Sequence, residues 1–205
     1  MISKKALIIL VIFILMIFGQ PCALAVSNDW ICIPGERVGP ITKDTNEKDL
    51  INMFGKNNVK TVKISASEEM GTPEETVSYI FPNSLNEIHI RWKNQRPWII
   101  TIYKQGTRWK MLEGNTVGTS LEEMIKINKK DFIIAGFGWE YGGWVSSWNG
   151  GEIEKKYKGK IDMFFDEGSG TLKDEEFMGD KKRIKTDNIQ LLRIKPKVKS
   201  LNIMF

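Results

Sequence analysis

Cysteine and histidine are scarce in this sequence, which has two cysteines and one histidine among its 205 residues. Structural zinc sites need four Cys or His ligands, so this composition excludes the usual zinc sets, and we expect no metal. Because Cys22 falls in a leader described below, Cys32 remains as a single cysteine and no internal disulfide can form. A hydrophobic core must then hold the fold together, and a chain of this size can bury roughly 70% of its unfolded surface.

Sequence motifs for phosphate binding and for nucleophilic catalysis are also missing. The glycine-rich stretch AGFGWEYGGWVSSWNGG (Ala135–Gly151) has Tyr141 where a dinucleotide fingerprint needs its third glycine, and strand-like residues follow where a helix is needed. The chain has neither a Gly-Lys-Ser/Thr P-loop nor a G-x-S-x-G elbow. We therefore expect no cofactor, no catalytic residues and a protein that is not an enzyme.

The single histidine, His89, alternates with Ile88 and Ile90 in a strand-like segment. Its side chain should face away from theirs, and we expect a solvated or hydrogen-bonded strand histidine. A glycosidase would need two carboxylates at a separation that the sequence does not give. The carboxylates that could serve are Glu140, Asp162, Asp166 and Glu167.

One acidic segment, Asp166–Phe177 (DEGSGTLKDEEF), has the length of a calcium-binding EF-hand loop. It carries glycine at its third and fifth positions and phenylalanine at its twelfth, where oxygen ligands belong. We therefore predict no EF-hand, and a looser calcium site stays as a minor alternative.

The N-terminus has the three parts of a secretory signal peptide. Met1–Lys5 is basic, Ala6–Phe18 is an unbroken apolar run, and Ala23-Leu24-Ala25 is an A-x-A cleavage signature. The apolar run is short against the roughly 20 residues that a membrane-spanning helix needs. Because the residues before Cys22 do not resemble a lipobox, lipid anchoring is not expected. We predict cleavage after Ala25, a periplasmic or secreted protein, and no stable membrane insertion afterwards.

The charge balance is close to even once the leader is removed. Two lysines leave with it, so 28 Lys and Arg face 25 Asp and Glu. Charged runs such as Glu154–Lys160 and Asp180–Lys185 are short and mixed in sign, which is typical of a solvated face. A nucleic-acid-binding domain gathers its basic residues on one face, so we expect no nucleic-acid partner.

Two helices and nine strands are predicted. Asp44-x-x-Glu47 and Thr119-x-x-Glu122 resemble capping boxes, and we expect the helices to stop at Gly55 and Asn128. Each entry is followed by apolar residues at helical spacing: Leu50, Met53 and Phe54, then Leu121, Met124 and Ile125. The strand-like segments are Val59–Ser65, Thr76–Phe81, Glu87–Lys93, Trp98–Lys104, Arg108–Leu112, Phe132–Ala135, Trp144–Trp148, Lys160–Phe165 and Val198–Phe205. The pattern predicts an antiparallel α+β fold.

A faint internal repeat accompanies these elements. VGPITKDTNEKDLINMFG (Val38–Gly55) and VGTSLEEMIKINK (Val117–Lys129) share a Val-Gly entry, and aligning Thr45 with Thr119 superposes apolar helix positions. We predict two tandem helix-plus-sheet units, residues 26–113 and 114–205. No Pro- or Ser-rich linker separates them, so they should share one compact body.

Three segments carry a resemblance to known proteins: PGERVGPITKDTNEKDLINMFG, GNTVGTSLEEMIKIN and AGFGWEYGGWVSSWNGG. Together they resemble a family of exported bacterial proteins with no assigned activity, and the likeness covers most of the chain after the leader. The tandem helix-plus-sheet order is similar, more distantly, to β-lactamase inhibitory proteins and to small outer-membrane assembly lipoproteins. Those proteins are binding modules, so the resemblance implies binding rather than catalysis. The inhibitory proteins are usually disulfide-bonded, and this chain lacks the cysteines.

The glycine-aromatic stretch fits a hairpin, with turn signals at Asn149-Gly150 and Gly142-Gly143. In strand geometry its alternate residues share a face: Phe137, Trp139 and Tyr141, then Trp144, Ser146 and Trp148. The rings could simply line the core, because aromatic side chains bury large areas. They could instead form an exposed rim that stacks on a sugar or anchors a partner.

These observations lead to one expected function and one alternative. We expect an exported binding protein, inhibitor-like in character, that contacts a protein partner. The alternative is a cell-envelope protein that binds or processes carbohydrate. The predicted partner-binding residues are Trp139, Glu140, Tyr141, Trp144 and Trp148.

Overall fold

The computed structural model describes residues 28–66, 73–169 and 177–205, so the predicted leader lies outside the described part. The described residues have an α+β fold with four α-helices and thirteen strands. The helices are α2 (Glu47–Phe54), α3 (Leu121–Asn128), α4 (Glu152–Tyr157) and α5 (Ile189–Ile194), with a short 3₁₀ helix η1 (Lys56–Asn58).

A six-stranded antiparallel sheet forms the centre of the molecule. Its strands follow the order β11 (Ile161–Phe165), β13 (Val198–Met204), β7 (Arg96–Ile102), β6 (Ile88–Lys93), β5 (Glu75–Ile80) and β4 (Val59–Ile64). Successive side chains of a strand point to opposite faces, so each strand offers alternate residues to the core. The fully buried face of the central strands is rich in isoleucine: Ile80, Ile88, Ile90, Ile100, Ile102 and Ile203.

Two smaller sheets complete the fold. One has the order β3 (Ile41–Thr42), β2 (Arg37–Val38), β1 (Ile31–Ile33) and β8 (Lys110–Met111), and the β1–β8 pair is parallel. The other has the order β10 (Val145–Ser147), β9 (Ile133–Ala135) and β12 (Arg183–Lys185). Cys32 on β1 is fully buried, and this burial is the main cause that raises the pKa of its thiol to about 12. Cys32 therefore packs in the core as a small hydrophobic residue.

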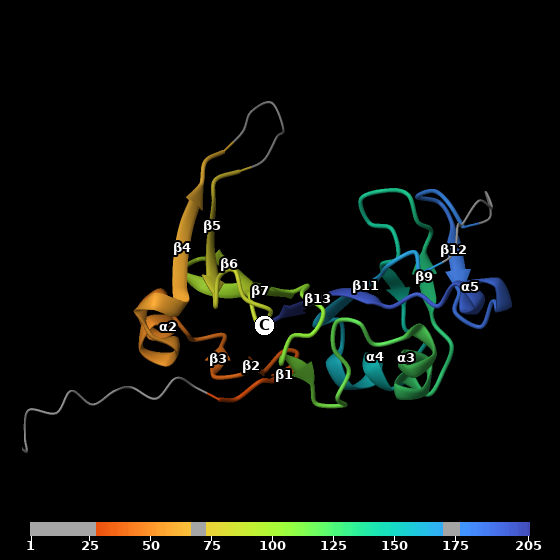
Figure 1. Cartoon of the computed structure of the whole chain (residues 1–205), viewed down its shortest axis with the longest axis horizontal. Helices are drawn as coiled ribbons and strands as arrows, with labels where there is room; N and C mark the ends of the chain where they lie inside the picture. The colour runs from red at the N-terminus through yellow and green to blue at the C-terminus, as the bar shows by residue number, and fades with distance from the viewer. Residues whose placement is uncertain (1–27, 67–72, 170–176) are drawn as a thin grey trace, which may run out of the picture.

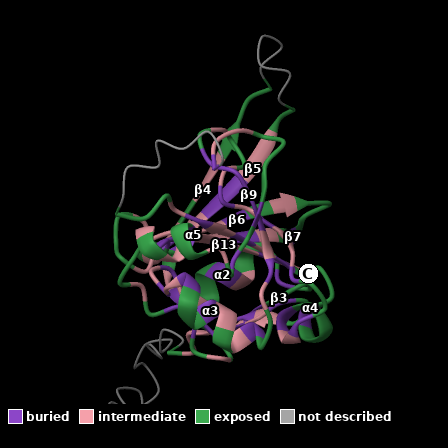
Figure 2. Ribbon diagram, turned by 90° about the vertical axis from the view of Figure 1, so that its right-hand side faces the viewer, coloured by how far each residue is buried: buried purple, intermediate pink, exposed green. Residues whose placement is uncertain are grey.

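Two hairpins project from the molecule, one from the six-stranded sheet and one from the three-stranded sheet. In Figure 1, α3 and α4 lie below β11 and β13, while the β4–β5 hairpin and the loop between β9 and β10 rise at opposite ends. Figure 2 shows the buried residues gathered in the middle of the molecule. One hydrophobic core cluster draws residues from both halves of the chain, including Phe54, Trp109, Phe132 and Phe165.

Helices α2 and α3 begin one or two residues later than predicted. Asn46 caps α2: its side chain accepts from the Asp49 amide at 3.1 Å, and the Asp49 carboxylate accepts from the Asn46 amide at 2.9 Å. Ser120 caps α3 in the same way, accepting from Glu123 N at 3.2 Å. The predicted caps at Asp44 and Thr119 are therefore corrected. The predicted ends, Gly55 and Asn128, are confirmed.

The hydroxyl of the residue before each cap explains the shift. The Thr45 hydroxyl accepts from Thr42 N at 3.0 Å, and the Thr119 hydroxyl accepts from Thr116 N at 2.9 Å. Each threonine thereby closes the turn that leads into its helix and leaves the next residue to act as the cap. A turn closed by a threonine hydroxyl therefore precedes both helices.

The nine predicted strands are confirmed, with ends that differ by no more than two residues. Sequence periodicity missed β1, β2, β3 and β12, which have two or three residues each, and the six-residue helices α4 and α5. Asn149-Gly150 forms a turn as predicted, but this turn leads from β10 to α4, which Gly151 caps, and not to another strand of a hairpin.

The predicted division into two tandem units is not confirmed. Strands β4 to β7 come from the first predicted unit and β11 and β13 from the second, yet all six belong to one sheet. The joining pair is β7 with β13, in which Thr101 lies opposite Asn202.

Candidate functional site

The glycine-aromatic stretch forms the connection of a hairpin. Strands β9 and β10 pair antiparallel, and the chain between them reverses through turns at Trp139–Gly142 and Tyr141–Trp144. The hairpin prediction is therefore confirmed, although the connection is a loop and not a two-residue turn. We call residues 136–144 the aromatic loop.

Close backbone contact holds the aromatic loop against β11. The amide of Phe165 donates to Gly143 O at 2.9 Å, and Gly143 has a positive φ of 74°. A Cβ atom at Gly143 would lie 2.1 Å from Phe165 O, so only glycine fits there. Phe137, at the other end of the loop, is buried in the core. The loop is thus anchored at both of its ends.

The predicted partner-binding residues divide between surface and core. Glu140 and Tyr141 are exposed, and Trp139 and Trp144 are half-buried. The Trp139 and Tyr141 rings lie 5.3 Å apart, and Trp139 Nε1 donates to Gly136 O at 2.7 Å, so this exposed pair is ordered. Trp148 is only 8% exposed. Its ring packs on Phe132 with centroids 4.9 Å apart, so Trp148 belongs to the core.

A cavity of about 600 Å³ lies beside the aromatic loop, with Trp139, Asp166, Glu167 and Lys199 in its wall. One oxygen of the Asp166 carboxylate already accepts from Gly168 N at 3.0 Å and from Lys197 N at 2.8 Å. The Asp166 carboxylate therefore binds backbone amides of its own loop and of the residue before β13. Residues 170–176 of the acidic segment Asp166–Phe177, where a looser calcium site was the minor alternative, lie outside the described residues.

The face of the six-stranded sheet opposite the isoleucines carries a polar and aromatic row. Residues directly opposite each other in neighbouring antiparallel strands point to the same face. The strand pairing places one residue from each strand in a line that we call the central row: Lys60, Tyr79, His89, Thr101, Asn202 and Asp162. All six are half-buried or exposed. The row is about 24 Å long, since neighbouring strands lie about 4.8 Å apart.

Side-chain contacts join two pairs of neighbours within the central row. Thr101 Oγ1 donates to Asn202 Oδ1 at 2.8 Å across the β7–β13 junction. The His89 ring makes an edge contact with Tyr79, with centroids 4.6 Å apart. At the far end, Trp144 Nε1 donates to Asp162 Oδ1 at 3.2 Å, so the aromatic loop adjoins the row.

A buried carboxylate holds His89 in place. Glu87 is 8% exposed, and its Oε1 accepts from the Tyr103 hydroxyl and from His89 Nε2, the latter at 2.9 Å. Its Oε2 accepts from Asn83 N. Burial alone would raise the Glu87 pKa, but these hydrogen bonds outweigh it and hold the pKa at about 2. An ionised carboxylate only accepts, so His89 Nε2 carries a proton. The prediction of a hydrogen-bonded strand histidine is confirmed.

The Tyr103 hydroxyl completes this cluster. Burial first, and then the Glu87 carboxylate, raise the pKa of Tyr103 above its usual range, so the hydroxyl stays protonated as a donor. The Tyr103 ring lies 4.7 Å from the His89 ring on the side away from the buried isoleucines. The cluster therefore places the His89 and Tyr103 rings on this face of the sheet, and their hydrogen bonds to the Glu87 carboxylate fix their orientation.

Comparisons with protein-family models, with curated proteins and with solved structures find no match to this chain. The resemblances described from the sequence stay predictions. Among the described residues, no helix is long and apolar enough to span a membrane. In the same part of the chain, no three His, Cys, Asp or Glu side chains gather in a group that could hold a metal ion.

Proposed function

We propose that this protein is a binding module that presents the open face of its six-stranded sheet to a protein partner. The observation that carries the proposal is the central row, in which six neighbouring strands each contribute one solvent-accessible side chain. We call this row, the flanking Tyr103 and Trp98, and the adjoining aromatic loop the open face.

The side chains of the open face suit protein recognition. Tyrosine and tryptophan dominate the binding energy of many interfaces, and Tyr79, Tyr103, Trp98 and Trp144 supply them here. Trp98 is 44% exposed, and Lys93 Nζ lies over its ring at 5.2 Å. Hydrogen bonds to Glu87 and Asp162 order the Tyr103 and Trp144 rings before any partner arrives, which lowers the entropy cost of association.

The sequence repeat supports a finer proposal, that the chain arose by tandem duplication. Helices α2 and α3 have eight residues each, and their first residues, Glu47 and Leu121, are 74 positions apart. The same separation relates the threonines that close the preceding turns, Thr45 and Thr119. It also relates the strands that follow, since β4 begins at Val59 and β9 at Ile133.

The strand order fits the same proposal. In the first unit, β4, β5, β6 and β7 pair in succession. In the second, β9 pairs with β10, a bridge from Trp144 to Phe164 joins the start of β10 to β11, and β11 pairs with β13. The edge strands of these two runs, β7 and β13, then pair with each other. Under this proposal the partner surface spans the junction between the units, with Thr101 and Asn202 at its centre.

We also propose that the protein is exported, as its N-terminal sequence indicates, and that it acts without catalysis. The Glu87–His89 pair on the open face is committed to structure, because Glu87 also accepts from Tyr103 and from the Asn83 backbone. The alternative function, carbohydrate binding, is supported by a different part of the molecule.

The proposed function can be tested by affinity capture from the cells that produce the protein. We expect at least one protein to be captured, and Tyr79→Ala combined with Tyr141→Ala to reduce its yield at least tenfold. Ile189→Ala is the matched control, because Ile189 is an exposed apolar side chain on α5. Equal capture by the double variant and the parent would contradict the proposal.

A further inference from the structure

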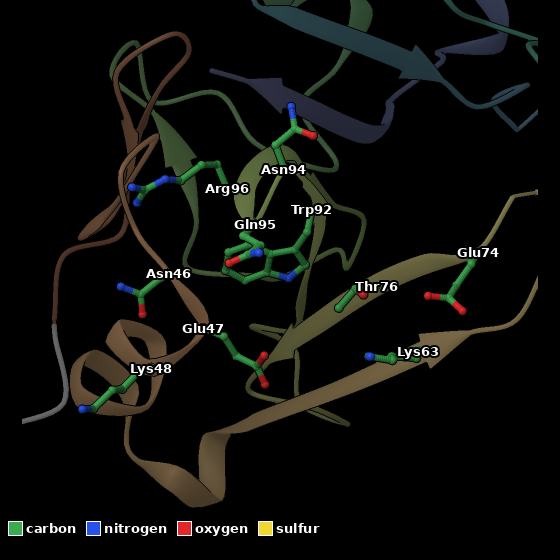
Figure 3. A pocket seen from close by; sticks show the side chains of 10 residues that line it. All are labelled: Asn46, Glu47, Lys48, Lys63, Glu74, Thr76, Trp92, Asn94, Gln95 and Arg96. Carbon is green, nitrogen blue, oxygen red and sulfur yellow. The ribbon is translucent and has the colours of Figure 1, made fainter.

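A second tryptophan site lies on the opposite face of the same sheet. A cleft of about 1010 Å³ opens between the start of α2, the β4–β5 hairpin and the turn from β6 to β7. Figure 3 shows the Trp92 indole in the middle of the side chains that line it. The lining residues on which the argument rests are Trp92, Glu47, Lys63, Thr76, Asn94 and Gln95. We call this site the Trp92 cleft.

The Trp92 ring is held by a chain of side-chain hydrogen bonds. Its Nε1 donates to Ser78 Oγ at 3.0 Å, and Ser78 Oγ lies 2.7 Å from Thr61 Oγ1 on the neighbouring strand. Ser78 is fully buried, whereas Trp92 is half-buried. The polar edge of the indole is therefore satisfied inside the protein, and part of the ring remains available in the cleft.

The wall of the Trp92 cleft is polar on every side. Asn94 and Gln95 stand exposed at the β6–β7 turn, where both have positive φ angles of 51° and 59°. Thr76 and Lys63 come from the β4–β5 hairpin, and Glu47 extends from α2 (Figure 3). These groups offer amide, hydroxyl, ammonium and carboxylate atoms, hence both donors and acceptors.

This lining selects one chemical class of ligand. Among the described residues that line the cleft, Trp92 is the single apolar one, so an apolar ligand would find few contacts there. The wall also holds two carboxylates, Glu47 and Glu74, beside three cations, Lys48, Lys63 and Arg96. Arg96 already donates to Asp44 O, so the carboxylates balance the remaining cations and disfavour a phosphate or another strong anion. A sugar ring fits both facts, because its C–H face packs on an indole and its hydroxyl groups both donate and accept.

We propose that the Trp92 cleft binds a pyranose ring of a β-linked glycan. Such a ring, with its substituents equatorial, presents axial C–H bonds that lie flat on the indole of Trp92. Its hydroxyl or acetamido groups then pair with the side chains of Asn94, Gln95 and Glu47. The site is separate from the open face, so the protein can hold a glycan and a protein partner at once.

Isothermal titration calorimetry with the purified protein tests this site, with chitotetraose and cellotetraose as soluble probes. We expect measurable binding of at least one probe and at least a tenfold loss of affinity in Trp92→Ala. A second variant, Asn94→Gly with Gln95→Gly, removes both amide side chains while glycine suits the positive φ of the turn. We expect that variant to keep the parent's melting temperature within a few degrees and to bind about fivefold more weakly.

The matched control is Trp98→Ala, which removes an indole from the other face of the sheet and should leave the affinity for the probe unchanged. Absence of binding by the parent to both probes would overturn the proposal. So would unchanged affinity in the glycine variant, which decides the question even where Trp92→Ala fails to fold. Tyr79→Ala should bind the probe normally, so loss of the glycan site and loss of the protein-binding surface are separate results.

Discussion

The two faces of the six-stranded sheet differ in what their side chains contact. On one face, Ile88, Ile90 and Ile100 are fully buried in the core. On the other, the central row keeps solvent exposure, and its polar groups bond mainly to one another and to the aromatic loop. The buried isoleucines of the first face therefore account for stability, and the central row of the second is free to serve recognition. Substitutions on the two faces should accordingly differ in kind, and the experiments below test that difference.

The largest loss of stability is expected from a substitution in the aromatic loop. A loop that borders a preformed binding surface must be held as rigidly as the core. Gly143→Ala should lower the free energy of unfolding by about 4 kcal/mol, because the new methyl group meets Phe165 O and the backbone has a positive φ. Urea denaturation measures the change. Gly150→Ala is the control: φ is 67°, but the new Cβ would meet only Lys130 Nζ, at 3.9 Å, so it should cost only about 1 kcal/mol. Equal effects would show that the loop is not anchored.

Neighbouring residues on β7 compare the two faces directly. Ile100→Ala should cost about 3 kcal/mol of stability, since it leaves a cavity in the core. Thr101→Ala removes one hydrogen bond to Asn202 and should cost about 1 kcal/mol. Chemical denaturation of both variants provides the measurement. A Thr101 effect as large as that of Ile100 would mean that the open face also supports the core.

Glu87, which holds His89 and Tyr103 of the open face by hydrogen bonds, should contribute to stability. Its folded-state pKa of about 2 lies below the ordinary 4.5, so the stabilisation is complete above about pH 4.5 and is lost as the pH falls toward 2. Glu87→Gln should cost about 2 kcal/mol at neutral pH and should flatten the acid limb of the stability curve. Thermal melts from pH 2 to pH 7 check both expectations. Glu36→Gln, at an exposed position, should leave that limb as it is.

The smallest effect on stability is expected at the exposed tip of the aromatic loop. Tyr141 is 48% exposed, and replacing it with alanine should change the free energy of unfolding by less than about 0.5 kcal/mol. Thermal denaturation beside Ile189→Ala gives the comparison. If Tyr141→Ala lowered the free energy of unfolding by more than about 1 kcal/mol, its ring would support the fold and would not lie free to bind a partner.

Alternation along the chain predicted much of this arrangement. The order of polar and apolar residues gave nine strands, and it placed His89 opposite Ile88 and Ile90. The aligned threonines, Thr45 and Thr119, also precede both helices as the repeat implied. These features depend on residues close together in the chain, which is why a local pattern reveals them.

The candidate site depends on contacts that no local pattern contains. Thr101 meets Asn202 only because β7 pairs with β13, a register set by the whole sheet. The Glu87–His89–Tyr103 cluster likewise joins β6 to the end of β7, although the spacing of Glu87 and His89 could have placed them on one face. Trp148 looked equivalent to Trp144, but its ring packs against Phe132 in the core.

The central claim, that the open face meets a protein partner, is tested most directly by photo-crosslinking in the cells that produce the protein. Benzoylphenylalanine would replace Tyr79 on the central row, Tyr141 on the aromatic loop, and Ile189 on α5 as the control. The account predicts one discrete crosslinked protein at Tyr79 and Tyr141 and none at Ile189. Crosslinking at Ile189 with none at the other two positions would contradict it.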